Sequence, residues 1–236
     1  AMMQIRNELA TLRYRSHGNW TCPVVIRVPV GGYIHGSLCH SQSIDGYFTH
    51  LPGIIIMYPS NAEDAKMMLK TACRMNDPVL YLEHKGLYRQ GYAATKEPDE
   101  NALSEIGRGK VVQKGNDVTI ISWGAMIQKS IEASNESSSS VEIIDLRYLY
   151  PLDFELIKKS VKKTSKVIIV HEDNLTNGFG AEIAAQISDE CFEYLDAPIK
   201  RVASKDFPIA YASKLEEQIL VQTDWILDSI NKICSY

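Results

Sequence analysis

The chain has no long hydrophobic run and no surplus of positive charge. None of its apolar stretches reaches the length of about 18 residues that a helix needs to cross a bilayer, so no membrane-spanning segment is expected. Its 25 lysine and arginine residues are interspersed with 29 aspartate and glutamate residues, which gives a formal net charge of -4. A basic face that would bind nucleic acid is therefore not expected either.

Cysteine is scarce and scattered. The five cysteines include no Cys-x-x-Cys pair, so the sequence favours neither a zinc site nor a disulfide framework. An odd number of widely separated cysteines instead indicates a reducing compartment. They are Cys22, Cys39, Cys73, Cys191 and Cys234.

Several catalytic and targeting signatures are absent as well. The Gly-x-x-x-x-Gly-Lys-Ser/Thr spacing of a phosphate-binding loop does not occur, and no Gly-x-Ser-x-Gly elbow supports a serine hydrolase. Neither a signal peptide nor an N-cap precedes the first helical pattern, which is formed by Met2, Ile5, Leu9 and Leu12. Such a start is typical either of an ordinary N-terminal helix or of a chain cut within a longer protein.

Strand and helix patterns alternate along the sequence. A composition of 45% hydrophobic and 23% charged residues is that of a globular protein with a sizeable core. In the first part, strand patterns at 23–28, 54–58 and 79–82 accompany a helix at 62–75 with Asn61 as its N-cap. Ser41 is expected to cap a short helix that runs towards Phe48. This β-α-β alternation predicts an α/β fold with an open sheet.

A second alternation follows a stretch without clear periodicity. Residues 91–116 are punctuated by glycine and charge and are expected to form an interdomain linker. Further on, strands are predicted at 118–121, 141–144, 166–170 and 199–202, and helices at 125–133, 153–161, 180–191 and 223–233. The chain is therefore predicted to contain two open sheets with flanking helices, one in residues 1–90 and the other in residues 117–236.

The stretch GGYIHGSLCHSQS at 31–43 holds two histidines, His35 and His40, among glycine, serine and cysteine. Glycine lets the backbone approach a ligand closely, and histidine titrates near neutral pH, so the stretch suits proton transfer. His40 is expected near the N-terminus of the helix capped by Ser41, where the helix dipole disfavours imidazolium and attracts carboxylates. Two interpretations stay open: His40 either exchanges protons with a bound acid or is a structural histidine whose ring nitrogens the backbone satisfies.

The other histidines and glycines carry weaker signals. His50 lies at a predicted helix end and suits a structural role. The sequence His-Glu-Asp at 171–173 follows a strand, at the sheet edge where α/β proteins place functional loops, but it lacks the His-Glu-x-x-His spacing of a metal-binding helix. The sequence Gly-Phe-Gly at 178–180 precedes a helix and either binds an anion or allows close packing of helix on sheet, with packing favoured.

Several segments together resemble one family over nearly the whole chain. They are VIRVPVGGYIHGSLCHSQS at 25–43, LPGIIIMYPSNAEDAK at 51–66, NDPVLYLEHKGLYR at 76–89, NDVTIISWG at 116–124, VEIIDLRYLYPLD at 141–153, LTNGFGAEIAAQI at 175–187 and ECFEYLDAPIKRV at 190–202. With them the chain resembles the beta subunit of the thiamine-diphosphate-dependent 2-oxo acid dehydrogenases, and most of all the branched-chain 2-oxoisovalerate type. The resemblance implies the latter part of a transketolase-like pyrimidine-binding domain up to residue 90 and a transketolase C-terminal domain from residue 117.

The resemblance also implies roles for individual residues. It places the histidine of His-Ser-Gln, here His40, at the active site, where it would donate or relay a proton to the thiamine-bound intermediate and assist acyl transfer to lipoamide. His35 matches a second histidine of the branched-chain members and is the second catalytic candidate. In some members main-chain carbonyls hold a potassium ion, and the matching positions here are Val24, Ala72, Cys73, Met75 and Asp77.

Other parts expected of the family have no match in this sequence. The glutamate that activates the aminopyrimidine of the cofactor would come before Ala1, which favours a chain cut within a longer protein. The Gly-Asp-Gly…Asn motif for magnesium and diphosphate belongs to the alpha subunit or alpha half. No cofactor-binding residue is therefore assigned, and the chain alone is expected neither to bind thiamine diphosphate tightly nor to turn over a 2-oxo acid. The implied compartment is the bacterial cytoplasm or the mitochondrial matrix.

Three functions stay open at this point. The first is a component of a 2-oxo acid dehydrogenase for branched-chain 2-oxo acids or pyruvate, working with an alpha subunit or alpha half. The second is a module that pairs with a second beta copy and docks the lipoyl and subunit-binding domains of an acyltransferase; Glu216, Glu217 and Asp224 would contribute to docking or simply form a solvated face. The third is a relative of transketolase or deoxyxylulose-phosphate synthase, although the His-Ser-Gln stretch lacks the arginines of a sugar-phosphate pocket.

Overall fold

The first sheet follows from the predicted β-α-β alternation. The computed structural model describes residues 1–236, and in it β1 (Val25–Val30), β3 (Val79–His84) and β2 (Ile55–Met57) lie parallel in that spatial order. Because β3 has a neighbour on each side, its apolar run is almost wholly buried. Helix α5 (Ala62–Ala72) leads from β2 to β3, and the Asn61 side chain caps it by accepting a hydrogen bond from the Asp64 amide at 2.9 Å. The alternation predicted for this part is confirmed.

The other helical segments of the first part are short. They are α1 (Met2–Gln4), the π-helical turn η1 (Ile5–Leu9), α2 (Leu12–Arg15), α3 (Ser37–His40), α4 (Asp45–Thr49) and the 3-10 turns η2 (Lys85–Leu87) and η3 (Gly91–Ala93). The helix start predicted at Ser41 is wrong, because Ile44 precedes α4 and the Ser41 hydroxyl instead accepts a hydrogen bond from the Gly36 amide at 2.9 Å.

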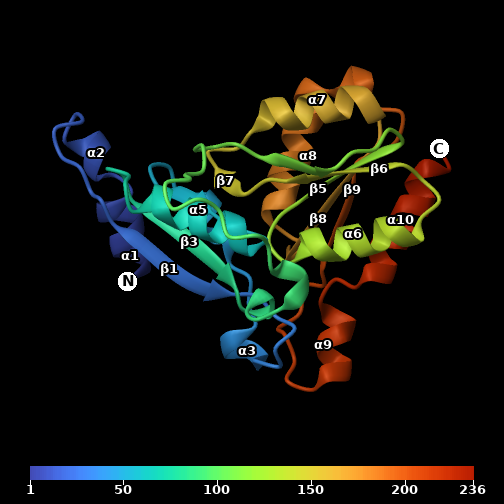
Figure 1. Ribbon diagram of the computed structural model, residues 1–236, viewed down its shortest axis with the longest axis horizontal. Helices are drawn as coiled ribbons and strands as arrows, with labels where there is room; N and C mark the ends of the chain where they lie inside the picture. Colours follow the sequence, from blue (N-terminus) through green and yellow to red (C-terminus); the bar gives the residue numbers. More distant parts are fainter.

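The second sheet is larger and carries helices on both faces. Its spatial order is β4 (Lys110–Gln113), β6 (Val141–Asp145), β5 (Val118–Ser122), β8 (Val167–Asn174) and β9 (Lys200–Ser204), and only β4 is antiparallel to its neighbour. Helices α6 (Met126–Glu136) and α10 (Thr223–Cys234) cover one face, and α7 (Phe154–Thr164) and α8 (Phe179–Glu190) cover the other (Figure 1). The turn η4 (Phe192–Tyr194) and helix α9 (Ser213–Ile219) complete this part. None of the helices is long and apolar enough to span a membrane.

The core explains why the strands of the second sheet read as continuous apolar runs. Alternate residues of each central strand enter different layers: Ile120 packs towards α6 and α10, whereas its neighbour Ile121 packs towards α7 and α8. Both isoleucines have no exposed surface. At about 25 cal/mol per Å² of apolar surface, such two-sided burial is the main stabilisation available to this sheet.

The two parts of the chain are joined by more than their connecting segment. Strand β7 (Tyr148–Tyr150), which the sequence patterns did not predict, lies antiparallel to β2 and so completes the first sheet from the second half of the chain. One cluster of 22 buried residues contains side chains from both sheets. The segment predicted as a linker also has structure, since it contributes β4 to the second sheet and the Ser104 carbonyl accepts a hydrogen bond from Thr71 of α5. The division at residues 90 and 117 itself stays a prediction.

Candidate active site

The two candidate histidines lie on the segment that leaves β1 and reaches the second part of the molecule. We call residues 31–43 the histidine loop. It begins with Gly31 at φ +88°, where a Cβ atom would stand 2.2 Å from Nε2 of His84. A Cβ atom on Gly32 would stand 2.4 Å from Cδ1 of Leu220. Glycine is therefore required at Gly31, which combines a positive φ with the close approach to the His84 ring, whereas a Cβ atom at Gly32 would displace the side chain of Leu220.

The loop has a strained backbone. Tyr33, His35 and Ser37 have φ angles of 61°, 54° and 56°, in the left-handed region that residues with a Cβ atom rarely adopt. Each costs roughly 1–2 kcal/mol, so the loop keeps this shape only because surrounding contacts determine it. Such strain is typical of functional sites.

The first of these contacts is the buried carboxylate of Glu172 at the end of β8. Its Oε1 accepts hydrogen bonds from the Gly32 amide at 2.6 Å and the Ser43 hydroxyl at 3.2 Å. Its Oε2 pairs with Nε2 of His84, which is buried at the end of β3. Burial alone would raise the pKa of Glu172, but attraction to His84 and these hydrogen bonds outweigh it, so the pKa is lowered. Glu172 thus stays ionised and ties both ends of the loop to β8.

The second contact is Glu216 of α9. Its carboxylate is only 3% exposed and lies 2.9 Å from Nδ1 of His35. The amide of His35 and the hydroxyl of Ser41 also donate to its Oε1, at 3.3 and 3.5 Å. Glu216 was expected on a solvated or docking face; this expectation is wrong, because its carboxylate is buried against the histidine loop.

A third contact joins the helix after the loop to the second sheet. The buried Asp45 of α4 accepts a hydrogen bond from Nε1 of Trp123 at 2.7 Å, and the Gly46 amide donates to Asp173 at 3.1 Å. Burial, reinforced by the charge of Asp173, raises the pKa of Asp45 well above its ordinary value. Burial likewise raises the pKa of Asp173. Burial thus favours the protonated form of these carboxyl groups at the junction, most strongly for Asp45.

The histidine loop brings His35 and His40 to the surface. The His40 side chain is exposed and its ring makes no hydrogen bond. Its main chain is held at both groups, because its carbonyl accepts from Nζ of Lys85 and its amide donates to the Gly36 carbonyl at 3.2 Å. The structural interpretation, in which the backbone satisfies the ring, is therefore wrong. So is the expected helix N-terminus, because His40 ends α3 instead of beginning a helix. The side chain of His35 is 55% exposed and keeps Nε2 without a protein partner.

Outside the loop, the buried His171 has a structural role. His171 is buried and stacks on Trp123 with ring centroids 5.5 Å apart and planes at 1°. Burial lowers its pKa to about 4, so the ring stays neutral near pH 7. His50 follows α4 and is exposed. No group of three or more histidine, cysteine, aspartate or glutamate side chains is arranged to hold a metal ion.

The five carbonyl positions proposed for potassium lie near the C-terminal end of α5. The carbonyls of Val24 and Ala72 accept hydrogen bonds from the amides of Val79 and Met75. Those of the other three residues accept none, which leaves their lone pairs available; they are Cys73, Met75 and Asp77.

The roles of Glu216 and Glu172 at the histidine loop could not be predicted from the sequence. The motif at 171–173 was recognised as a candidate functional loop, but nothing local indicated that its glutamate would meet His84, which lies 88 residues earlier in the chain. Glu216 lies 181 residues after His35, in an ordinary acidic helix, so no local signal could have found it.

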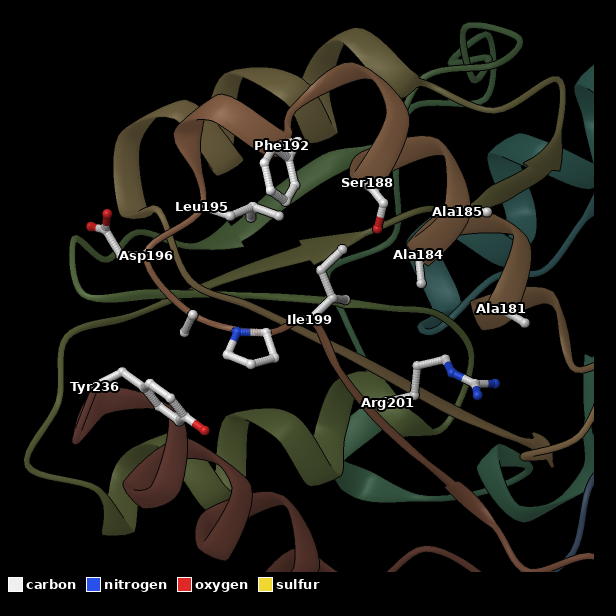
Figure 2. Close-up of a pocket in the computed structure, with 12 residues that line it drawn as sticks. Ala181, Ala184, Ala185, Ser188, Phe192, Leu195, Asp196, Ile199, Arg201 and Tyr236 are labelled. Atoms are coloured by element: carbon white, nitrogen blue, oxygen red, sulfur yellow. The ribbon is translucent and has the colours of Figure 1, made fainter.

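A separate groove of about 690 Å³ lies on the second part of the molecule, away from the histidine loop (Figure 2). Small side chains of α8 form one wall, and Ile199 and Arg201 of the β9 segment form its floor. Figure 2 shows Phe192 at one side and Tyr236 at the opposite side. The α8 residues are Ala181, Ala184, Ala185 and Ser188.

The comparisons with known proteins agree with this architecture. Residues 2–90 match the transketolase pyrimidine-binding domain, and residues 107–226 match the transketolase C-terminal domain. A solved structure, a split-gene transketolase described as an inactive beta4 tetramer, shares the fold with a TM-score of 0.77 at 23% identity, covering 100% of this chain and 71% of that one.

Sequence relatives are more specific. The 2-oxoisovalerate dehydrogenase subunit beta of Bacillus subtilis is 39% identical over 240 residues, which cover 100% of this chain and 73% of the relative. The pyruvate dehydrogenase E1 component subunit beta of the same bacterium is 40% identical over 219 residues, 91% of this chain and 67% of the relative. The mitochondrial 2-oxoisovalerate dehydrogenase subunit beta 2 of Arabidopsis thaliana is 39% identical over 243 residues, 100% of this chain and 66% of the relative.

The chain thus spans about two thirds to three quarters of the length of these relatives, with both transketolase domains in the expected order. It belongs to the family of beta subunits of the 2-oxo acid dehydrogenases.

Proposed function

We propose that this chain is the beta component of an enzyme that decarboxylates a branched-chain 2-oxo acid or pyruvate and transfers the acyl group to lipoamide, with His40 as its proton-transfer residue. The observation that carries the proposal is the histidine loop. An exposed imidazole without a protein partner stands on a loop that buried carboxylates hold in one strained shape. Such a group is free to exchange a proton with a molecule that approaches from outside the chain.

The pyrimidine-binding domain implies thiamine diphosphate, which supplies the carbanion chemistry of decarboxylation when bound. The residues around the loop do not form a magnesium or diphosphate site, because the carboxylates of Glu172 and Glu216 are already engaged by donors of this chain. The magnesium ion and the diphosphate of the cofactor are therefore proposed to be held by an alpha subunit or alpha half. This supports the expectation that the chain alone binds the cofactor weakly and is inactive.

Contacts within the chain fix the main chain that carries the two imidazoles. Nζ of Lys85 holds the carbonyl of His40, so the position of the His40 main chain is set while its ring stays free. Burial lowers the pKa of Lys85. His35 offers Nε2 from the same loop and is the second candidate for proton transfer. The match of His35 to the branched-chain members favours a branched-chain 2-oxo acid over pyruvate.

A potassium ion is proposed at the end of α5. The free carbonyls of Cys73, Met75 and Asp77 fit an ion that takes oxygen ligands, whereas those of Val24 and Ala72 would share their lone pairs with existing hydrogen bonds. The ion would stabilise the turn between α5 and β3 and would take no part in the chemistry.

The partners are proposed from the surface. The groove of Figure 2 lies beside the edge strand β9 and suits a second copy of the chain. Glu217 and Asp224 are exposed and remain available to the lipoyl and subunit-binding domains of an acyltransferase. The compartment is either the bacterial cytoplasm or the mitochondrial matrix, since the relatives include bacterial and mitochondrial proteins.

Replacing His40 with alanine in the assembled alpha–beta enzyme tests the proposal. Because general acid–base catalysis contributes about 100-fold or more, lipoamide-dependent turnover should fall by at least that factor while thiamine diphosphate binding stays close to normal. Steady-state assays and calorimetric titration measure the two quantities. His50→Ala removes another exposed imidazole, outside the loop, and should leave turnover unchanged. Full lipoamide-dependent turnover in His40→Ala would exclude the assignment.

A further inference from the structure

One carboxylate of the second part of the molecule serves the histidine loop alone. The two oxygens of Glu216 meet Nδ1 of His35, the amide of His35 and the hydroxyl of Ser41. No side chain outside the loop donates to them. A buried charge is costly unless it is paired, so the place of this carboxylate is explained by the loop it holds and not by α9 itself.

The contacts of Glu216 extend through the loop. The Ser41 hydroxyl that donates to Glu216 also accepts a hydrogen bond from the Gly36 amide at 2.9 Å. This chain of bonds joins the left-handed residue His35 to Ser41, the residue after His40. Figure 1 shows α9 reaching from the second part of the molecule to the neighbourhood of α3. Glu216 therefore fixes both ends of the short segment that carries the two imidazoles.

The contact also determines which nitrogen of His35 faces outwards. A carboxylate can only accept, so the nitrogen that meets it carries a proton. With Nδ1 held in this way, a neutral His35 ring presents Nε2 as an acceptor at the surface. The partner of one ring nitrogen thus sets the state of the other, as a carboxylate behind a metal-ligating histidine does.

We infer that Glu216 is a positioning residue of the proposed reaction, which fixes the Nδ1–H tautomer of His35 and holds the loop that presents His40. The expected effect of Glu216 on turnover rests on the proposed function, whereas its expected effect on the tautomer of His35 does not. Glu172 has a different part, since its carboxylate also pairs with Nε2 of the buried His84 and so contributes to the fold.

The first test is spectroscopic and uses the full 236-residue chain labelled with 15N-histidine. In the parent chain the ring nitrogens of His35 should show the Nδ1–H tautomer near neutral pH. In Glu216→Gln the single carbonyl oxygen is needed by the amide of His35 and the hydroxyl of Ser41, so the NH2 group faces Nδ1 and donates to it. The signal should therefore change to the Nε2–H tautomer. Glu216→Asp keeps the charge and should retain Nδ1–H, and His35→Gln assigns the signal by its loss. An identical His35 spectrum in Glu216→Gln would overturn the inference.

The second test measures turnover in the assembled alpha–beta enzyme. Lipoamide-dependent kcat should fall about 10-fold or more in Glu216→Gln and recover in part in Glu216→Asp, while the melting temperatures of both stay close to that of the parent. Glu136→Gln, at an exposed glutamate ending α6, is the matched control and should be unchanged. A parental kcat in Glu216→Gln would refute the positioning role.

The two proposals fail in different ways. If His40→Ala keeps full turnover while Glu216→Gln still changes the His35 tautomer, the assignment of His40 is wrong and the tautomer control by Glu216 stands. If His40→Ala is impaired and the His35 spectrum does not respond to Glu216→Gln, the proposed function stands and the further inference is wrong.

Discussion

At the scale of single residues, Asp145 shows how the junction of the two sheets responds to pH. This carboxyl group at the end of β6 is fully buried and accepts hydrogen bonds from the Ser60 hydroxyl and, at 3.0 Å, from the Arg147 amide. Burial raises its pKa from 3.8 to about 7, since the hydrogen bond from Ser60 offsets only part of the desolvation. The folded protein therefore holds a proton on Asp145 that the unfolded chain has already released above about pH 4.

This difference makes a stability contribution that is present below pH 4 and lost as the pH rises towards 7. Between these values only the folded state binds the proton, so the free energy of unfolding should fall with pH by up to about 1.4 kcal/mol per unit from this group. Asp145→Asn should remove that component. Urea unfolding at pH 5, 6 and 7 measures the difference in the free energy of unfolding between parent and variant. This difference should change by roughly 1–3 kcal/mol over the range, in favour of the variant at higher pH.

The matched control for Asp145 is Asp189→Asn, at an exposed position of α8. The difference in the free energy of unfolding between this control and the parent should stay constant over the same pH range. A constant difference for Asp145→Asn would show that the buried carboxyl titrates normally in the folded state.

The sequence predicts site residues only where their chemistry is concentrated locally. His35 and His40 could be proposed as candidates because both lie in one glycine-rich stretch. The environment of His40 could not be predicted, because the hydroxyl of Ser41 accepts a hydrogen bond from the Gly36 amide before it and does not cap a helix after it. Glu172 and Glu216 act across the fold, and their partners are determined by how the two sheets meet.

At the scale of elements, the start of α8 depends on glycine. A Cβ atom on Gly178 would stand 2.3 Å from the carbonyl oxygen of Asn174 and 2.4 Å from Cε1 of His171. A Cβ atom on Gly180 would stand 2.4 Å from Cδ2 of His171. The close-packing interpretation of these glycines is thereby confirmed, because α8 approaches β8 too closely for any larger residue.

Gly178→Ala should destabilise the protein, because a rigid backbone carbonyl and a buried ring cannot both move aside. Overpacking of this kind costs about 1–3 kcal/mol, which thermal unfolding can measure as a lower melting temperature. Gly91→Ala is the control, since nothing lies within 4 Å of the added methyl group, and it should change stability by no more than about 0.5 kcal/mol. Equal melting temperatures for the two variants would contradict the packing argument.

Most elements could be predicted from periodicity because they are buried on one or two faces. The elements that were missed are short and depend on distant partners: α3, α9, β4 and β7. Strand β7 is three residues long and forms only because β2 offers it an edge. Its local pattern contains no information about that pairing.

At the scale of the whole molecule, the groove of Figure 2 bears on self-association. Phe192 and Tyr236 are 76% and 74% exposed beside a surface lined by alanines. Projecting aromatic rings and a shallow wall of small side chains on one face are self-complementary, as a twofold interface requires. This face is therefore the proposed contact with the second beta copy.

Ala185→Glu places a charge in that groove at an exposed helical position, so it should disrupt pairing without unfolding the chain. Sedimentation velocity should show a dimer for the parent and a monomer for the variant. Asn135→Glu adds the same charge on α6, outside the groove, and should stay dimeric. A variant that dimerises as well as the parent would place the contact elsewhere.

The pairing of β7 with β2 also determines the order of events while the chain is being made. About 90 residues separate Met57 from Tyr148, and at about 5–20 residues per second a ribosome needs roughly 5–20 s to add them. During that interval β2 has an unpaired edge, which is a template for pairing with another nascent chain. The first sheet is therefore completed only after β4, β5 and β6 of the second have been translated, and until then a neighbouring chain on the same polysome can compete with β7 for the free edge of β2.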